Sequence, residues 1–346
     1  MAEHPWAKDV GLVLNFEARG TSGPVVLFET SQGNNWLIDT LGRTVPHPVA
    51  NSLMFDIYRI LPYDTDLTVF KGAGLAGMNF AFIDDSTHYH THLDNLTNLD
   101  ERSLQHQGSY ALALAAYFGD LNLETSRHGN AIYFDLLGAT LVHYPAAWVL
   151  PLTVLVILAY VVVLLLGLRS RQVTLGRTVL SFLAFVLAMI VAAGAVILTW
   201  WLIRSLHSAY QAMAFSDVYH SGFYFLSFTL LTVAIVSALC VLARKRLGTP
   251  NLALGALLCG VLLLLASSFY LPGGTYLLIW PMLASLSTLG FLSVTKEEGN
   301  STIRVAVLAL GATPAILLLV PIIYLSRIQV GSATGRCLKN TSFGVR

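Results

Sequence analysis

The sequence predicts a two-part protein: an α/β domain of a sheet with flanking helices, followed by an all-α domain of several membrane spans. Of the 346 residues, 55% are hydrophobic and only 11% are charged, whereas soluble domains carry about 25% charged residues. Nearly all acidic residues precede Pro145, and long apolar runs follow it. Before that point, short strand-like runs alternate with helical patterns, which is typical of an α/β sheet.

The first strands and helices follow from hydrophobic patterning. Val10 to Phe16 is a continuous apolar run, as expected for a strand covered on both faces, and Pro24 to Thr30 is a second strand-like run. Asn34 to Leu41 and Asn51 to Leu61 have the apolar spacing of amphipathic helices. Leu67 to Phe70 has the composition of a further short strand.

A glycine-rich segment, Gly72 to Gly77, has the pattern G-x-G-x-x-G. In a dinucleotide-binding fold a helix begins inside this motif, and its N-terminus faces the pyrophosphate. Here the strand-like run Met78 to Ile83 follows instead. We therefore expect no nucleotide partner.

A long helix is predicted after the polar segment that follows this strand. Asn98 and Glu101 have the spacing of a capping box, and the helix would run to about Phe118. Its predicted apolar side consists of Leu104, Ala111, Leu112, Ala115 and Phe118. The α/β domain would then span residues 1–125, and the weakly patterned residues 126–145 would form a linker.

Three alternating histidines occur in the segment Ala81 to Asp100. In an extended segment His88, His90, His92 and Asp94 would all point to one side. Imidazole and carboxylate groups on one edge are typical ligands of zinc and neighbouring metals. The alternative is a polar loop whose histidines only form hydrogen bonds.

A carboxylate marks the predicted end of the first strand, where Glu17 lies in the sequence Asn-Phe-Glu-Ala-Arg-Gly. In open α/β sheets the carboxyl end of the strands is the edge at which ligands bind. The alternative for Glu17 is an exposed turn residue without a ligand role.

Three motifs occur in order along the N-terminal part: Asn-Phe-Glu-Ala-Arg-Gly at residues 15–20, Pro-Tyr-Asp-Thr-Asp at residues 62–66, and Tyr-His-Thr at residues 89–91 with Asp94. Together they resemble the C-terminal half of peptidase family M28, the di-zinc aminopeptidases. The resemblance covers about Ala2 to Asp120 and is closest to a membrane-anchored branch of endoplasmic-reticulum and vacuolar proteases. It implies a partial zinc-aminopeptidase-like fold, an incomplete sheet with flanking helices, for the N-terminal part.

The resemblance also implies roles for particular residues. Glu17 matches the acidic ligand of one zinc ion, and His90 matches the histidine ligand of the other. Asp64 and Asp66 lie where the family has a polar motif beside the substrate, so they would have a supporting role. Asp94 would orient the His90 loop. No ligand role is implied for the other two histidines.

The sequence departs from the family in its ligand set. The family's His-x-Asp motif, bridging Asp and Glu-Glu pair, which supply the other ligands and the general base, lie upstream of the segment matching Val10 to Gly20. Only nine residues precede Val10 here. Two ligands cannot hold two zinc ions in a catalytic geometry. We therefore expect a C-terminal part of a larger protease that is not a competent peptidase by itself.

The predicted membrane domain, residues 146–325, contains six apolar runs, and a polar tail of residues 326–346 follows. Each run has about the 20 residues needed to cross a bilayer core. The runs are Ala146 to Leu168, Val179 to Ile203, Gly222 to Ala243, Leu252 to Tyr270, Thr275 to Val294 and Ile303 to Leu325.

Basic residues predict the orientation of these spans. They concentrate in the loops after the first, third and fifth runs, which should therefore be cytoplasmic. With six spans, the N-terminal domain would then face the extracytoplasmic side, either the periplasm or the lumen of an organelle.

Three functions are compatible with these observations. The first is the C-terminal portion of a membrane-bound zinc aminopeptidase acting on peptides or proteins, and the second is a non-catalytic membrane scaffold or binding protein derived from a peptidase. The third, a transporter, is disfavoured because no run has a charge near its centre. The net charge of +1 argues against a nucleic-acid partner.

Overall fold

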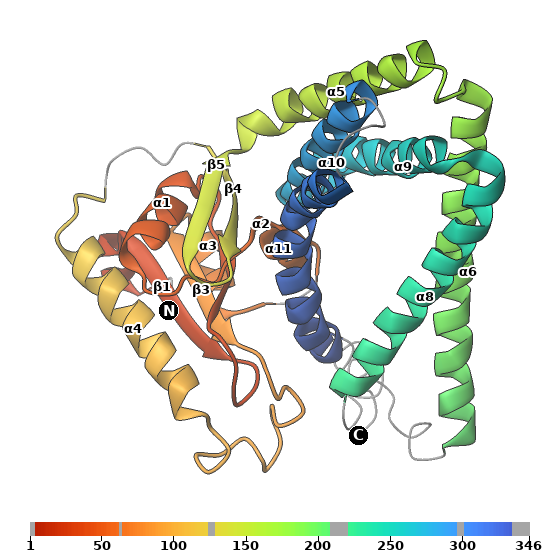
Figure 1. The fold of residues 1–346 in the computed structure, drawn as a ribbon. Coiled ribbons are helices and arrows are strands. Elements are labelled where there is room, and N and C mark those ends of the chain that lie inside the picture. Colours follow the sequence, from red (N-terminus) through yellow and green to blue (C-terminus); the bar gives the residue numbers. More distant parts are fainter. Residues whose placement is uncertain (1–3, 62–63, 124–128, 208–220, 296–300, 334–346) are drawn as a thin grey trace. The chain divides into compact units, whose positions relative to one another are not determined.

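The computed structural model describes residues 4–61, 64–123, 129–207, 221–295 and 301–333. The chain forms two compact units (Figure 1). One, here called the N-terminal unit, comprises Met1–Pro151 together with Ser267–Tyr276. The other, the membrane unit, comprises Leu152–Ala266 and Leu277–Arg346.

A three-stranded sheet forms the centre of the N-terminal unit. Strand β3 (Ala76–Phe82) lies in the middle, parallel to β1 (Leu12–Ala18) on one side and antiparallel to β2 (Val26–Thr30) on the other. The three strands agree with the predicted apolar runs. Strand β3 begins at Ala76, inside the glycine-rich segment, where a dinucleotide-binding motif would begin a helix, so the order of elements differs from that motif, as predicted.

One face of the sheet packs against α1 (Asn35–Thr44) and α4 (Glu101–Gly119). Figure 1 shows both helices beside the sheet. The contact is apolar: Phe80 of β3 lies edge-on to Tyr110 of α4 at 5.6 Å and stacks on Phe16 of β1 at 5.0 Å. Burial of such rings contributes much of the stability of a small domain.

The other face of the sheet contacts α2 (Ser52–Ile60) and α3 (Asp66–Gly72). Tyr58 of α2 packs with Phe28 and Ala81. This face also carries the polar side chains of Asn15, Asn79 and Glu29, whose positions in the three strands are adjacent. The two faces of the sheet are therefore chemically different.

Two local predictions are wrong. Leu67 to Phe70 is part of helix α3 rather than a strand, and the helix begins where the backbone N–H of Thr65 donates to Thr68 Oγ1 at 3.1 Å. Such capping stabilises a short helix over the strand preference of its residues. The long helix begins after Asp100, whose side chain accepts from Arg102 N, rather than after Asn98.

The buried face of α4 agrees with the predicted one at Phe118 but differs from it elsewhere. Leu104 and Leu112 are 55% and 75% exposed, whereas Tyr110 and Leu114 are fully buried. Tyr110 belongs to the core because its hydroxyl reaches the backbone of His47 and Val49 at 2.9 Å in each case. A helix with apolar residues on more than one face does not reveal which of them faces the sheet.

Segment 126–145, predicted to be a linker, contains the antiparallel hairpin of β4 (Ala131–Leu136) and β5 (Thr140–Pro145). Tyr133 of β4 is fully buried in the same core as the sheet residues. The N-terminal unit therefore extends to the start of the first apolar helix.

The rest of the chain is helical. Within its described residues, six helices are long and apolar enough to cross a membrane, as predicted, and a short 3₁₀ helix, η3 (Pro272–Gly274), lies between the fourth and the fifth. The helices are α5 (Val149–Arg169), α6 (Leu175–Leu206), α8 (Ser221–Leu247), α9 (Thr249–Tyr270), α10 (Tyr276–Val294) and α11 (Ser301–Ala333). In Figure 1, α6 and α8 run side by side. The chain is therefore an integral membrane protein with an α/β N-terminal unit.

Candidate metal-binding edge of the sheet

Glu17 lies at the carboxyl end of β1, directly beside Ala81 in the parallel strand β3. Because the two strands are parallel neighbours, the segments that follow them leave the sheet at the same edge. After β1 the backbone of Gly20 approaches Asp84 so closely that an added Cβ would lie 2.0 Å from its carbonyl oxygen. The end of the Glu17 strand is thus held against the start of the histidine loop.

The Glu17 carboxylate is half-buried and has a defined partner. Asn15 Nδ2 donates to Glu17 Oε1 at 2.8 Å. Burial raises the pKa of Glu17, the Asn15 hydrogen bond and the Arg19 charge oppose this, and the carboxylates of Asp66 and Glu29 add to it. A bound cation would favour the charged form of this carboxylate.

The histidine loop, residues 84–98, is a series of turns rather than an extended segment. Backbone hydrogen bonds join His88 N to Asp85 O and Thr91 N to His88 O, each at 3.0 Å. His90 has a positive φ of 60°. The prediction that three histidines and Asp94 share one face by strand alternation is therefore wrong, because turns do not alternate side chains.

His90 and His88 have different environments in this loop. His90 is exposed, and its ring stacks on that of Tyr89 at 3.9 Å. His88 is partly buried, with Nδ1 2.9 Å from Thr21 Oγ1 in the segment after β1. His92 is exposed. The structure therefore gives His88 a contact that ties the loop to the sheet and leaves the His90 ring open to solvent.

The three aspartates predicted to support the site lie in two places. Asp94 Oδ2 accepts a hydrogen bond from the backbone N–H of His90 at 3.4 Å, so it contacts the His90 backbone. Asp64 and Asp66 are exposed around the start of α3, and Asp66 is near enough to Glu17 to raise its pKa. Pro62 and Tyr63 of the same motif lie outside the described residues.

The donor chemistry of Glu17 and His90 fits zinc, which binds carboxylate oxygen and imidazole nitrogen. Within residues 4–61, 64–123, 129–207, 221–295 and 301–333, no group of three or more His, Cys, Asp or Glu side chains is arranged to hold a metal ion. Among the described residues, Glu17 and His90 are thus the two candidate zinc ligands, in segments that leave β1 and β3 at the same edge of the sheet.

A buried ion pair was not expected from the sequence. Lys71 Nζ lies 2.6 Å from Glu29 Oε1, and the Glu29 side chain is only 7% exposed. Asn79, fully buried in β3, donates to Glu29 Oε2 at 3.0 Å. In the sequence Glu29 and Asn79 lie within apolar runs and Lys71 follows one, but the register that pairs Glu29 with Asn79 includes a shift between Leu27 and Glu29 that the sequence does not reveal.

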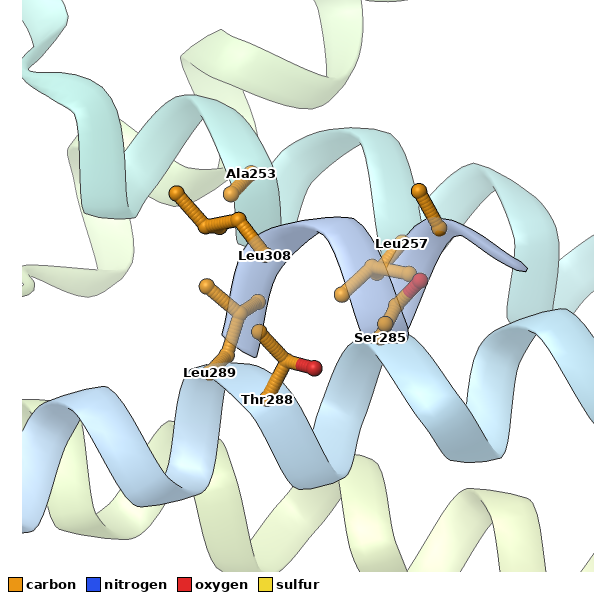
Figure 2. A pocket seen from close by; sticks show the side chains of 8 residues that line it. Ala253, Leu257, Ser285, Thr288, Leu289 and Leu308 are labelled. Atoms are coloured by element: carbon orange, nitrogen blue, oxygen red, sulfur yellow. The ribbon is translucent and has the colours of Figure 1, made fainter. Parts of the chain in front are cut away.

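The membrane unit has a groove of about 270 Å³ between three helices. Ala253 and Leu257 of α9, Leu289 of α10 and Leu308 of α11 make its lining mostly apolar, and Figure 2 shows the hydroxyls of Ser285 and Thr288 in the same view. None of the groove's lining residues is charged. The groove therefore offers none of the carboxylate and imidazole groups that lie at the sheet edge.

Residues 1–115 match the family model described as peptidase family M28. This match confirms, for the N-terminal part of the chain, the family resemblance inferred from the motifs. The chain thus joins a peptidase-like N-terminal part to a membrane part. No solved structure matches the chain.

Similar proteins point to the predicted branch of the family. The chain is 31% identical over 153 residues to endoplasmic reticulum metallopeptidase 1 of Rattus norvegicus, covering 42% of this chain and 17% of that protein. It is 28% identical over 203 residues to putative endoplasmic reticulum metallopeptidase 1-A of Caenorhabditis elegans, covering 54% and 23%. With the vacuolar membrane protease of Candida albicans (strain SC5314) it shares 33% identity over 138 residues, covering 39% and 16%. The matched segments span less than a quarter of each of these relatives.

Proposed function

We propose that this chain is part of a membrane-bound zinc-dependent peptidase of the aminopeptidase type, which acts on peptides or proteins. The observation that carries the proposal is the shared edge of β1 and β3. This edge brings the Glu17 strand end and the His90 loop together through Gly20 and Asp84. The two motifs that match the family are thus neighbours in space although about 70 residues separate them in the chain.

Each residue of the edge has a proposed role. Glu17 and His90 are zinc ligands, one for each of two zinc ions, and Asp94 holds the backbone of His90 in its turn. Asp64 and Asp66 are supporting residues on the substrate side. Bound zinc supplies Lewis-acid polarisation of a peptide carbonyl and lowers the pKa of a coordinated water.

By itself the chain is proposed to lack peptidase activity. A catalytic zinc ion takes three protein ligands with one open position, and the family resemblance assigns only Glu17 and His90 in this sequence. The remaining ligands and the general base would have to come from other residues. A membrane scaffold or binding protein derived from a peptidase is the alternative function.

The N-terminal unit is proposed to face the extracytoplasmic side of its membrane. Basic side chains lie at the C-terminal ends of the first and third apolar helices, at Arg169 in the last turn of α5 and Arg171 after it, and at Arg244, Lys245 and Arg246 in the last turn of α8. Loops at such basic ends are retained in the cytoplasm. The relatives named for the endoplasmic reticulum and the vacuole support an organelle membrane.

A zinc titration of the purified chain in detergent tests the proposal. We compare the wild type with Glu17→Ala, His90→Ala and, as a control, Glu101→Ala, which removes an exposed carboxylate from the start of α4. Weakening of zinc binding in the first two variants and not in the control is expected. Equal affinity in all four chains overturns the ligand assignment and favours the scaffold. Two tightly bound zinc ions per wild-type chain would contradict the proposed incompleteness.

A further inference from the structure

A line of polar side chains crosses the sheet face that contacts α2 and α3. It begins at the buried ion pair of Lys71 with Glu29, continues through Asn79 and Asn15, and ends at Glu17. The three strands contribute one or two members each, and Lys71 comes from the last turn of α3. Polar groups in such a position need mutual hydrogen bonds, because their burial is otherwise costly.

Glu29 is held as an acceptor at the start of this line. Its Oε1 faces Lys71 Nζ at 2.6 Å, and its Oε2 accepts from Asn79 Nδ2 at 3.0 Å and from the Thr65 hydroxyl at 3.4 Å. A buried carboxylate without the lysine would lack its counter-charge. Lys71 therefore fixes the position and the acceptor character of Glu29.

This acceptor determines the orientation of Asn79. The Asn79 amide nitrogen lies between two oxygens, Glu29 Oε2 at 3.0 Å and Thr65 Oγ1 at 2.8 Å. The reversed amide would place Asn79 Oδ1 against a carboxylate oxygen, with no hydrogen between two acceptors. Asn79 Oδ1 must therefore face the other way, toward β1.

The orientation of Asn79 in turn determines the orientation of the Asn15 amide. Its Nδ2 donates to Asn79 Oδ1 at 2.9 Å and to Glu17 Oε1 at 2.8 Å. Because Asn79 presents an acceptor, Asn15 is oriented with its amide nitrogen toward both oxygens. The donor that faces Glu17 is thus specified by a series of contacts that starts at Lys71.

We propose that Lys71, Glu29, Asn79 and Asn15 are positioning residues that orient the Glu17 carboxylate for metal binding. The inference rests on the proposed role of Glu17 as a zinc ligand. Partners that hydrogen-bond a metal-ligating side chain fix its orientation, and their loss lowers metal affinity by about 10- to 100-fold. None of the four contacts requires the metal to be present, so the series pre-orients Glu17 before binding.

The test measures the zinc dissociation constant and the thermal unfolding midpoint of the full chain in detergent. Asn15→Ala and Lys71→Met are each expected to weaken zinc binding by about 10-fold or more, and Lys71→Arg, which keeps a cation beside Glu29, should restore it. Arg43→Met is the matched control, because it removes the cation of the Arg43–Asp39 ion pair on α1. Asn15→Ala keeps the test valid if Lys71→Met fails to fold.

The outcomes separate the inference from the function on which it rests. If Glu17→Ala weakens zinc binding while Asn15→Ala and Lys71→Met bind zinc as the wild type does, only the positioning role is overturned. A lower unfolding midpoint with unchanged zinc affinity in those two variants would give the series a purely structural role and also overturn the inference. If the wild-type chain binds no measurable zinc, or if Glu17→Ala leaves zinc binding unchanged, the role of Glu17 as a zinc ligand is overturned, and the positioning role is overturned with it.

Discussion

Asp56 Oδ2 accepts a hydrogen bond from the backbone N–H of Gly273 at 2.6 Å, across 217 positions of the sequence. The carbonyl of the same glycine accepts from Ser52 Oγ at 2.7 Å. Two side chains of α2 therefore bind both backbone groups of one residue in η3, the short segment between α9 and α10. Next to it, Tyr276 stacks on Phe134 at 4.6 Å. A loop between two apolar helices is thus a structural part of the N-terminal unit.

Gly273→Ala is expected to disrupt this contact. A Cβ at this position would lie 2.2 Å from the Ser52 carbonyl oxygen and 2.8 Å from Asp56 Oδ2, and backbone cannot move as easily as a flexible side chain. Overpacking of this kind costs about 1–3 kcal/mol. We expect a lower thermal unfolding midpoint in detergent and faster proteolysis of the loop at η3.

A second glycine serves as the control for that experiment. Gly108 lies in α4, and an added Cβ would meet nothing within 4 Å. Gly108→Ala should raise helix stability by about 0.5–1 kcal/mol. Opposite signs for the two substitutions are expected; a neutral or stabilising effect at Gly273 would show that η3 is not held by α2.

The same contact predicts a pH dependence. Burial raises the pKa of Asp56, and the Gly273 hydrogen bond and the Arg59 charge only partly oppose it. In the unfolded chain Asp56 has the ordinary carboxyl pKa of about 3.9. As the pH rises, Asp56 therefore loses its proton at a lower pH in the unfolded chain than in the folded chain. The free energy of unfolding therefore falls as the pH rises toward the raised value.

Asp56→Asn removes that titration while it keeps an oxygen to accept from Gly273 N. Relative to the wild type, the variant should lose less stability as the pH rises from about 4, near the ordinary carboxyl pKa, through the raised pKa of Asp56. The difference between the two unfolding midpoints is the measurement, because it cancels the titration of Asp135, whose pKa burial also raises. Parallel curves for the two proteins would exclude Asp56 as a source of the pH dependence.

The two neighbouring histidines should differ in any form of the protein that hydrolyses peptides. His90→Ala is expected to abolish activity, because it removes a proposed zinc ligand. His88→Ala should leave most of kcat/KM and cost about 1 kcal/mol of stability, since it removes only the hydrogen bond to Thr21. Peptidase rates and unfolding midpoints of both variants provide the measurement. Equal losses of activity would mean that the wrong histidine was assigned.

The strands and the six apolar helices could be predicted because their signals are local. Apolar runs of four to eight residues identify strands, and runs of about twenty identify spans. The strand preference of Leu67 to Phe70 was misleading because capping at Thr65 and contact with the sheet select a helix there. Local propensity gives no information on such tertiary contacts.

The candidate site was only partly predictable. Glu17 was identified by its place at a strand end, but its link to Lys71 depends on strand order and on the bulge in β2. Neither can be read from the spacing of residues. The side chains of the histidine loop were misplaced because strand alternation was assumed for a segment that folds as consecutive turns. The docking of η3 on α2 joins residues more than 200 positions apart, with no periodicity to signal it.

The docked loop also bears on the orientation of the chain in the membrane. Of the six apolar helices in the described part of the chain, four lie between the hairpin of the N-terminal unit and η3, namely α5, α6, α8 and α9. An even number of crossings returns the chain to the side from which it started, which agrees with the presence of η3 in the N-terminal unit. An odd number would place η3 on the opposite side, where it could not contact α2.

Thiol labelling can measure that orientation. After replacement of the three native cysteines by serine, Thr97→Cys places one thiol in the exposed histidine loop, and Ser170→Cys places one after α5. A membrane-impermeant maleimide should label Thr97→Cys only from the extracytoplasmic side, and Ser170→Cys only from the cytoplasmic side, because positively charged loops stay in the cytoplasm. Labelling of both thiols from one side would contradict the six-span arrangement, and reversal of the two sides would leave the spans intact but overturn the proposed orientation.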